Sequence, residues 1–297
     1  MAELLKGAPV AEALKRETAE TVRALKEAGC PPTLALLRVG ERPDDLAYER
    51  GVRRVAEETG VTLRPTVLPE EVPQETFLRT LESLNADPDV HGILLFRPLP
   101  KQLDGELARR LILPEKDVDG CTDGSLAGVF TGSGEGFTPC TAEAALRILK
   151  AYGIALAGKR AAVIGRSLVV GKPAAMLLMA ENATVTVCHS RTPDVAKVTR
   201  EADIVISAAG RLGSLTGAHV APGQTVIDVS VNWDPEKPNS RGGLGALAGD
   251  ARWAEVEPVV SAITPVPGGV GAVTTAVLLH HAALAAKRAF TKAGNVL

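Results

Sequence analysis

Short apolar runs alternate with amphipathic stretches along almost the whole chain, and this alternation is what most limits its possible folds. Runs such as TLALLRVG (33–40) and RAAVIG (160–165) have the length and β-branched content of buried strands. Stretches such as 44–59 and 74–85 repeat apolar residues at helical spacing. Strands that alternate with helices predict an α/β fold with largely parallel sheets.

The alternation falls into two series separated by a segment rich in Gly and Pro. The first series predicts strands at 33–40, 62–68 and 92–99 and helices at 8–28, 44–59 and 74–85. The segment 113–141 is expected to be a linker that carries site residues. The second series predicts a helix at 141–153, strands at 160–165, 184–189, 203–210, 225–231 and 258–264, and a final helix at 273–290. Because this long Ala/Leu helix can return to the first part, we expect the second domain to be inserted into the first.

Composition excludes several classes of protein. The chain has 297 residues, 45% of them hydrophobic and 23% charged, with a net charge of −2. Mixed charges of this kind indicate no basic surface that would bind nucleic acid or an anionic membrane. No apolar run is expected to span a membrane, and the charged amphipathic N-terminus does not resemble a signal peptide, so we expect a cytoplasmic protein. The four cysteines form no CxxC pair, which predicts reduced thiols and no metal site.

The stretch 158–192 has the pattern of a nucleotide-binding βαβ unit. A strand ends in Gly165, a loop runs to Gly171, and a helix follows. Glycine lets a backbone approach a pyrophosphate, and a helix N-terminus presents N–H groups to it. The spacing differs from GxGxxG, so an ordinary strand–helix turn is an equal alternative on pattern alone.

The end of the next strand indicates which nucleotide would bind. NAD enzymes commonly place a carboxylate there for the ribose 2′-hydroxyl. This chain instead has His189, Ser190 and Arg191, with Arg166 in the preceding loop. Two guanidinium groups and a hydroxyl suit a 2′-phosphate, although they would also be ordinary on a solvated surface. We favour NADP.

At GRSLVVGKP (165–173) the sequence resembles the cofactor loop of the methylenetetrahydrofolate dehydrogenase/cyclohydrolase family, the bacterial FolD proteins. Further matching motifs follow the family's order over nearly the whole chain. They are RVGERPDDLAY (38–48), GILLFRPLP (92–100), PEKDVDG (114–120), FTPCT (137–141), ATVTVCHSRT (183–192), ADIVISAAG (202–210), VIDVSVN (226–232) and ITPVPGGVGAVTTAVLL (263–279).

The resemblance implies a two-domain α/β fold with a cleft between the domains. A Rossmann-like NADP domain (141–272) would be inserted into a folate-binding catalytic domain (1–140 plus 273–297). It also implies a homodimer in one-carbon metabolism. The family oxidises 5,10-methylenetetrahydrofolate with NADP and then hydrolyses the methenyl cation to 10-formyltetrahydrofolate.

For the cofactor, the resemblance implies contacts from three strand ends. Gly165, Arg166 and Ser167 would lie against the phosphates, Ser190 would contact the 2′-phosphate, and Val231 would supply backbone contact. Together with the pattern of basic residues, the expected cofactor-binding set is Gly165, Arg166, Ser167, Gly171, His189, Ser190, Arg191 and Val231.

For the substrate, the resemblance implies four residues. Asp119 of KDVDG would hydrogen-bond the pterin edge, as a carboxylate can do in a bidentate way. Tyr48 would lie over the pterin and p-aminobenzoyl region, and Tyr48 and Asp119 are the expected catalytic residues. Gly268 and Gly269 would line the cleft, and both also suit a tight turn that needs positive φ.

Two positions depart from the family in a way that bears on mechanism. The family's helix reads Tyr, three residues, then the proton-transferring Lys, whereas the fourth residue after Tyr48 is Val52. Phe96 stands where the family has the Gln thought to set that lysine's protonation. A shift of one residue would make Arg53 the counterpart, but an arginine, like Arg97, is a poor general base because it stays protonated.

We therefore expect an NADP-dependent methylenetetrahydrofolate dehydrogenase whose cyclohydrolase activity is weak or lost. The first alternative is the fully bifunctional enzyme. A second is a non-catalytic paralogue that binds NADP and folate. A more distant one is a shikimate- or amino-acid-type dehydrogenase, although we find no catalytic Lys/Asp pair placed for it in the first domain.

Overall fold

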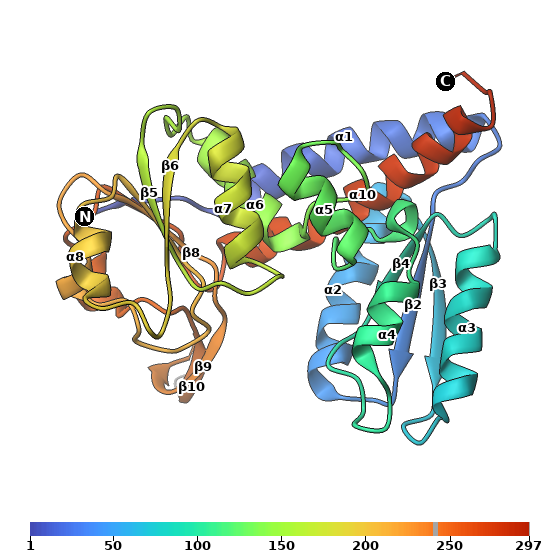
Figure 1. Cartoon of the computed structure of the whole chain (residues 1–297), viewed down its shortest axis with the longest axis horizontal. Coiled ribbons are helices and arrows are strands. Elements are labelled where there is room, and N and C mark those ends of the chain that lie inside the picture. Colours follow the sequence, from blue (N-terminus) through green and yellow to red (C-terminus); the bar gives the residue numbers. More distant parts are fainter. Residues whose placement is uncertain (240–242, 297) are drawn as a thin grey trace. The chain divides into compact units, whose positions relative to one another are not determined.

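The computed structural model describes residues 1–239 and 243–296 and divides into two compact units (Figure 1). The six-stranded unit comprises residues 1–11 and 141–274, and the three-stranded unit comprises 12–140 and 275–297. The expected first domain began at residue 1, whereas residues 1–11 group with the six-stranded unit. The reason is that a short strand at Glu3–Leu4 pairs with Ala262–Ile263. The assignment of each unit to folate or NADP stays a prediction at this point.

The three-stranded unit is built on a parallel sheet of order β3-β2-β4. Its elements are α1 (Gly7–Glu27, which begins in the other unit), β2 (Thr33–Val39), α2 (Pro43–Thr59), β3 (Thr62–Leu68), α3 (Gln74–Ala86), β4 (Gly92–Leu95), α4 (Gly105–Leu111), η1 (Pro114–Lys116), α5 (Asp123–Thr131) and most of α10 (Val270–Lys292).

Both faces of β2 are buried, which explains the apolar run from Leu34 to Leu37. Leu37 packs in a cluster with Phe77 and Leu81 of α3 and Ala108 of α4. Leu36 is also buried, and successive strand residues point to opposite faces, so the second face is covered as well. Figure 1 shows β2 as the central strand of this sheet.

The six-stranded unit contains a wholly parallel sheet of order β1-β11-β8-β7-β5-β6. Its elements are β1 (Glu3–Leu4), α6 (Cys140–Ala151), β5 (Arg160–Ile164), α7 (Gly171–Ala180), β6 (Thr184–Cys188), α8 (Val195–Arg200), β7 (Ile204–Ser207), η2 (Gly217–His219), β8 (Thr225–Asp228), β9 (Asn232–Pro238), β10 (Leu244–Ala248), α9 (Trp253–Val256) and β11 (Ala262–Ile263). The α/β prediction is confirmed.

Several predicted boundaries were wrong in detail. The segment 113–141 was expected to be loop, but it contains η1 and α5, whose N-terminus is capped by the Thr122 hydroxyl. The strand expected at 258–264 is limited to Ala262–Ile263, and the strand expected at 92–99 ends at Leu95. The antiparallel pair β9–β10 was not predicted, because its charged and Pro-containing sequence lacks a strand pattern.

One helix contradicts the expectation that no apolar run could span a membrane. By length and composition α10 would suffice, but 72% of its apolar window is buried within the protein. Its apolar residues pack inside the fold, and His280 lies 3.1 Å from the Thr18 hydroxyl of α1. We conclude that α10 is a core helix. All four cysteines are free, and Cys140 and Cys188 are buried, whereas Cys30 and Cys121 are half-buried.

Truncating the core of the three-stranded unit should be costly. We expect Phe77→Ala to lower the free energy of unfolding by about 3–5 kcal/mol, because Phe77 is fully buried. The matched control Phe130→Ala, at a side chain that is 75% exposed, should change it by less than about 0.5 kcal/mol. Urea unfolding followed by far-UV circular dichroism would measure this, since both tryptophans lie in the other unit. Equal effects of the two variants would contradict the described core.

Candidate active site

The carboxyl edge of the six-stranded sheet gathers the predicted cofactor residues. All pairings are parallel, so every strand ends at this edge. β5 lies between β6 and β7, so the chain leaves it first toward one side and later toward the other. Such a reversal opens a crevice at the carboxyl ends, where doubly wound α/β proteins bind ligands. The predicted residues follow β5, β6 and β8 and therefore meet there.

The turn between β5 and α7 requires glycine at two positions. Gly165 has φ of 116°, and a Cβ on it would lie 2.2 Å from the Ala208 carbonyl oxygen in the loop after β7. Gly171 opens α7, and a Cβ on it would lie 2.2 Å from the Gly165 carbonyl oxygen. Strand end and helix start thus pack too closely for any side chain.

Ser167 caps α7 in this structure. Its Oγ accepts hydrogen bonds from Val170 N at 3.1 Å and Gly171 N at 3.4 Å. Lys172 N donates to the Ser167 carbonyl oxygen at 3.0 Å. The first helical N–H groups are therefore already paired, but the Ser167 O–H and the exposed Arg166 guanidinium remain as donors for a phosphate. The residues present fit a phosphate-bearing cofactor.

A tight turn follows β6 and exposes two of the predicted side chains. Thr192 N donates to the His189 carbonyl oxygen at 2.8 Å, and Arg191 N donates to His189 Nδ1 at 3.2 Å. His189 is therefore a half-buried turn residue, whereas Ser190 and Arg191 are exposed. No carboxylate occurs in this turn (189–192), so a hydroxyl and a guanidinium are the groups offered to a ribose or its phosphate.

Asp250 fastens the loops after β7 and β8. It is fully buried, and its carboxylate accepts hydrogen bonds from Ala209 N and Arg211 N, both at 2.8 Å, and from the Ser230 hydroxyl at 2.8 Å. Val231, which follows Ser230, is exposed. One buried carboxylate thus fixes the backbone on either side of the predicted cofactor contact at Val231.

Asp228 is a second buried carboxylate beside Asp250. It ends β8, and its Oδ2 accepts a hydrogen bond from Ala251 N at 2.8 Å. Burial raises the pKa of Asp228 to about 6, although the backbone hydrogen bond from Ala251 opposes the shift. The side chain is therefore partly protonated near neutral pH.

Gly268 and Gly269 form a tight turn before α10. Gly268 has φ of 102°, and its carbonyl accepts a hydrogen bond from Gly7 N at 2.8 Å. A Cβ on Gly269 would lie 2.6 Å from the Pro265 carbonyl oxygen. The expected positive φ is confirmed for Gly268 but not for Gly269, where the close approach of the Pro265 carbonyl requires glycine instead. Their contact with a substrate stays a prediction, as does the cleft expected between the domains.

The predicted substrate residues lie in the three-stranded unit. Tyr48 on α2 is half-buried and contacts the buried Phe96, which follows β4, edge to face, with 6.0 Å between ring centroids. Burial, followed by the charge of Asp119, raises the pKa of Tyr48 well above its ordinary value. Tyr48 is therefore a neutral hydroxyl that can donate a hydrogen bond.

Val52 and Arg53 take different environments on α2. Val52, one turn after Tyr48, is fully buried. Arg53 is exposed and donates to Glu49 Oε1 at 2.5 Å, while Arg38 donates to Glu49 Oε2 at 3.0 Å. Both guanidinium groups hold the pKa of Glu49 below its ordinary value despite its burial. Arg53 is therefore engaged in this ion pair, which disfavours it as the counterpart of the family's lysine.

Asp119 forms an ion pair that sequence reasoning missed. Arg97 Nη2 donates to Asp119 Oδ2 at 2.9 Å, and the two side chains are 31% and 23% exposed. Burial raises the pKa of Asp119, Arg97 lowers it, and Asp117 raises it. The predicted carboxylate is thus present at the end of the sheet with a guanidinium beside it.

The loop that carries Asp119 is held from inside. The fully buried Asp117 accepts hydrogen bonds from Cys121 N at 3.0 Å and Thr122 N at 2.7 Å. His281 of α10 lies with its Nδ1 2.9 Å from the Val118 carbonyl oxygen. The turn therefore has little freedom, so the position of Asp119 is set by its neighbours.

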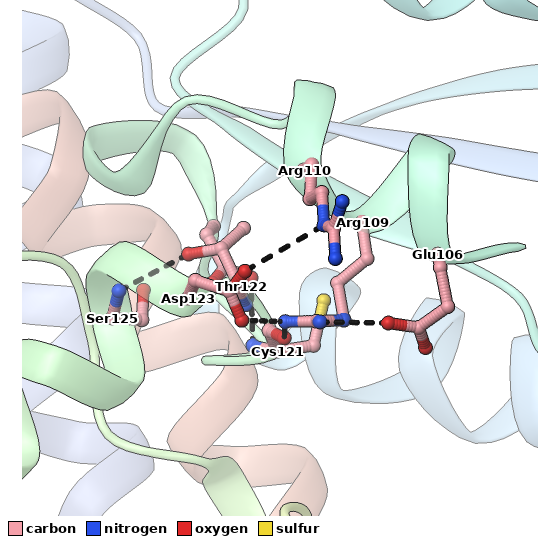
Figure 2. A network of polar contacts seen from close by, with 8 residues as sticks. Glu106, Arg109, Arg110, Cys121, Thr122, Asp123 and Ser125 are labelled. Carbon is pink, nitrogen blue, oxygen red and sulfur yellow. Dashed lines mark hydrogen bonds and ion pairs between the residues drawn. The ribbon is translucent and has the colours of Figure 1, made fainter.

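Arg109 of α4 clamps the far end of the same loop (Figure 2). Its Nη1 donates to Asp123 at 2.5 Å and to the Cys121 carbonyl oxygen at 3.3 Å, and its Nη2 donates to Glu106 at 2.8 Å. The Arg109 side chain is 10% exposed, whereas Arg110, 3.8 Å from Asp123, is 66% exposed. Arg109 alone of the two is therefore built into the loop.

Comparison with known proteins assigns a family to both parts of the chain. Residues 139–290 match the tetrahydrofolate dehydrogenase/cyclohydrolase NAD(P)-binding domain, and residues 5–119 match the catalytic domain of the same family. The bifunctional protein FolD of Carboxydothermus hydrogenoformans is 51% identical over 95% of this chain and 96% of its own length. The chain belongs to the FolD family.

Solved structures of FolD proteins share the fold. The bifunctional FolD of Campylobacter jejuni is 37% identical, with a TM-score of 0.90 over 97% of this chain and 99% of its own. The FolD of Trypanosoma brucei, solved with NADP and an inhibitor, is 36% identical, with a TM-score of 0.89 over 97% and 98%. The six-stranded unit is thus an NAD(P)-binding domain, and the predicted enzyme family and Rossmann-like fold are confirmed.

Asp228 should give the FolD fold a measurable pH dependence. Between about pH 4 and pH 6 the folded state binds more protons than the unfolded state, so the free energy of unfolding falls as pH rises. A pKa raised from 3.8 to about 6 corresponds to about 3 kcal/mol. We expect Asp228→Asn to remove this decline relative to wild type in urea titrations, and the exposed Glu236→Gln to leave it unchanged. Parallel pH profiles for wild type and Asp228→Asn would contradict this.

Removing the Arg109 clamp should loosen the loop that carries Asp119. We expect Arg109→Leu to lower the free energy of unfolding by about 1–2 kcal/mol and to speed amide hydrogen exchange in residues 117–125. Arg110→Leu, its exposed neighbour, should change neither by a measurable amount. Hydrogen-exchange mass spectrometry of both variants is the test, and unchanged exchange in Arg109→Leu would show that the clamp does not order the loop.

Proposed function

We propose that this FolD-family chain oxidises 5,10-methylenetetrahydrofolate to the methenyl form with NADP, and that its cyclohydrolase step is weak. The proposal that the cyclohydrolase step is weak rests on the environment of Val52. Val52 is fully buried one turn from Tyr48, and the ring of Phe96 lies against Tyr48. Neither side chain can transfer a proton.

The dehydrogenase step needs positioning more than acid–base chemistry. NADP, when bound, supplies the hydride acceptor. The methylene carbon of the substrate lies between two nitrogens, whose lone pairs stabilise the cation left when hydride departs. The protein's task is then to hold the substrate in place, and Asp119 and Tyr48 are the groups we propose for it. Asp119 accepts from the pterin edge, and the neutral Tyr48 covers the ring.

The cyclohydrolase step makes different demands. Water must add to the methenyl carbon and lose a proton, and a ring nitrogen must gain one. A positioned acid–base group typically contributes about 10²–10⁴-fold to such a step. The charge of Asp119 acts on Tyr48, and Asp119 is itself paired with Arg97. A guanidinium stays protonated and cannot act as the base.

The bifunctional enzyme is the alternative that the comparisons favour. The relative from Carboxydothermus hydrogenoformans and the structure from Campylobacter jejuni are both described as bifunctional. Under this alternative another group or bulk water replaces the lysine. A non-catalytic binding protein is the third candidate, and the intact Asp119 and cofactor turn argue against it.

We propose NADP rather than NAD because of the side chains at the carboxyl edge of the six-stranded sheet. Arg166, Ser190 and Arg191 are exposed there, and the turn after β6 carries no carboxylate. A 2′-phosphate would gain charge-assisted hydrogen bonds that a 2′-hydroxyl lacks. The NADP bound in the Trypanosoma brucei relative supports the same choice.

The domain roles and the assembly complete the proposal. The three-stranded unit would bind folate, and the six-stranded unit would bind NADP in the cytoplasm. We propose a homodimer, and the β9–β10 pair offers a surface for it, since Trp233, Leu244 and Leu247 are all exposed large apolar side chains.

One assay separates the three candidate functions. Purified protein is mixed with methylenetetrahydrofolate and NADP, and in a parallel reaction with NAD, while NADPH and methenyl absorbance are followed separately. Rising NADPH with accumulating methenyl product is the expected result. Conversion to formyltetrahydrofolate above the spontaneous rate would establish the bifunctional enzyme instead. Absence of NADPH would favour the binding protein.

Restoring the two replaced side chains should restore hydrolysis. We expect Val52→Lys with Phe96→Gln to raise the rate of methenyl hydrolysis by about 10²-fold or more, because burial lowers a lysine's pKa toward that of a useful base. The matched control Val55→Lys with Phe96→Gln places the lysine at another buried α2 position and should gain nothing. An unchanged rate in the first pair would show that Val52 is not the lysine's counterpart.

A further inference from the structure

Arg97 lies at the proposed substrate site, and some of its N–H groups are available to bind a ligand. Within the described residues its guanidinium makes one hydrogen bond, to Asp119 Oδ2. Its remaining N–H groups therefore have no protein acceptor in that part of the chain. Asp119 Oδ1 likewise accepts no hydrogen bond from the described side chains and backbone. The pair presents free donors and a free acceptor on neighbouring atoms.

Contacts on both sides of Arg97 hold its backbone in place and so limit where its guanidinium can lie. Phe96 is buried and packs against Tyr48. On the other side, Arg42 Nη1 donates to the Pro98 carbonyl oxygen at 2.9 Å. An arginine held at both flanks loses less conformational entropy when it binds a ligand than a free surface arginine does.

The pterin ring has an edge that matches this pair. Its 2-amino group and N3 each carry an N–H donor, and the adjacent 4-oxo group is an acceptor. A carboxylate can accept from the two donors, and a guanidinium beside it can donate to the oxygen. A site with Asp119 alone would leave the 4-oxo oxygen without that donor.

We propose that Arg97 is a second recognition residue for the pterin ring, donating to the 4-oxo oxygen while Asp119 accepts from the adjacent N–H groups. This rests on the proposed folate substrate. It assigns Arg97 a role in specificity as well as affinity. A 4-thioxo analogue would keep both N–H donors for Asp119 but offer Arg97 a sulfur, which is a weak acceptor, so a site that uses Arg97 discriminates against it.

The test compares two ligands on four proteins. Dissociation constants are measured for tetrahydrofolate and for its 4-thioxo analogue with wild type, Arg97→Leu, Arg97→Lys and the control Arg54→Leu, whose exposed guanidinium has no partner among the described residues. We expect Arg97→Leu to weaken tetrahydrofolate about tenfold or more and to shift the preference between the ligands several-fold toward the thioxo analogue. Arg97→Lys, which keeps a donor, should shift the preference less, and Arg54→Leu should shift neither value.

A purely structural role predicts a different result. If Arg97 only holds Asp119 in place, both ligands weaken by the same factor, because Asp119 contacts an edge that they share. An unchanged preference in Arg97→Leu therefore overturns this proposal and leaves the proposed function standing. Failure of wild type to bind tetrahydrofolate overturns both. NADP binding by each variant, together with circular dichroism, establishes that the variants are folded.

Discussion

Parallel strand pairing is the constraint on which the rest of this structure depends. Both larger sheets are wholly parallel, so each collects its strand ends along one edge. In the six-stranded unit that edge gathers the turns that follow β5, β6, β7 and β8. In the three-stranded unit it places Phe96 and Arg97 after β4, within reach of Asp119. Residues far apart in sequence become neighbours because parallel strands all end at the same edge of the sheet.

Buried carboxylates then convert these strand ends into defined sites. Asp250 binds the loops after β7 and β8, and Asp117 closes the turn around Asp119. Each accepts several backbone N–H groups that would otherwise be buried without partners. In both units, therefore, an aspartate inside the fold fixes a loop whose exposed side chains include the predicted ligand contacts.

The sequence was sufficient for the alternating elements and for the residues whose type is dictated by local geometry. β2 and β5 are mostly apolar, and Gly165 and Gly171 stand where any Cβ would clash, so pattern and turn chemistry identify them. The Asp119–Arg97 pair, the Asp250 network and the Arg109 clamp could not be derived that way, because each joins segments distant in sequence. The one indication of the ion pair was a charged residue among apolar ones, Arg97 in GILLFRPLP. From the sequence alone, Arg97 was considered only as a poor general base. The β9–β10 pair was missed because an exposed hairpin needs no apolar periodicity.

Ser167 supplies a hydrogen-bond acceptor inside the turn between β5 and α7. Its hydroxyl already holds the N–H groups of Val170 and Gly171, so the helix terminus is satisfied before any phosphate arrives. A phosphate that takes those N–H groups exchanges one set of hydrogen bonds for another, and the released hydroxyl becomes its donor. The net gain from such an exchange is smaller than from filling vacant donors. A phosphate bound at this turn would therefore dissociate more readily than one bound to N–H groups without partners.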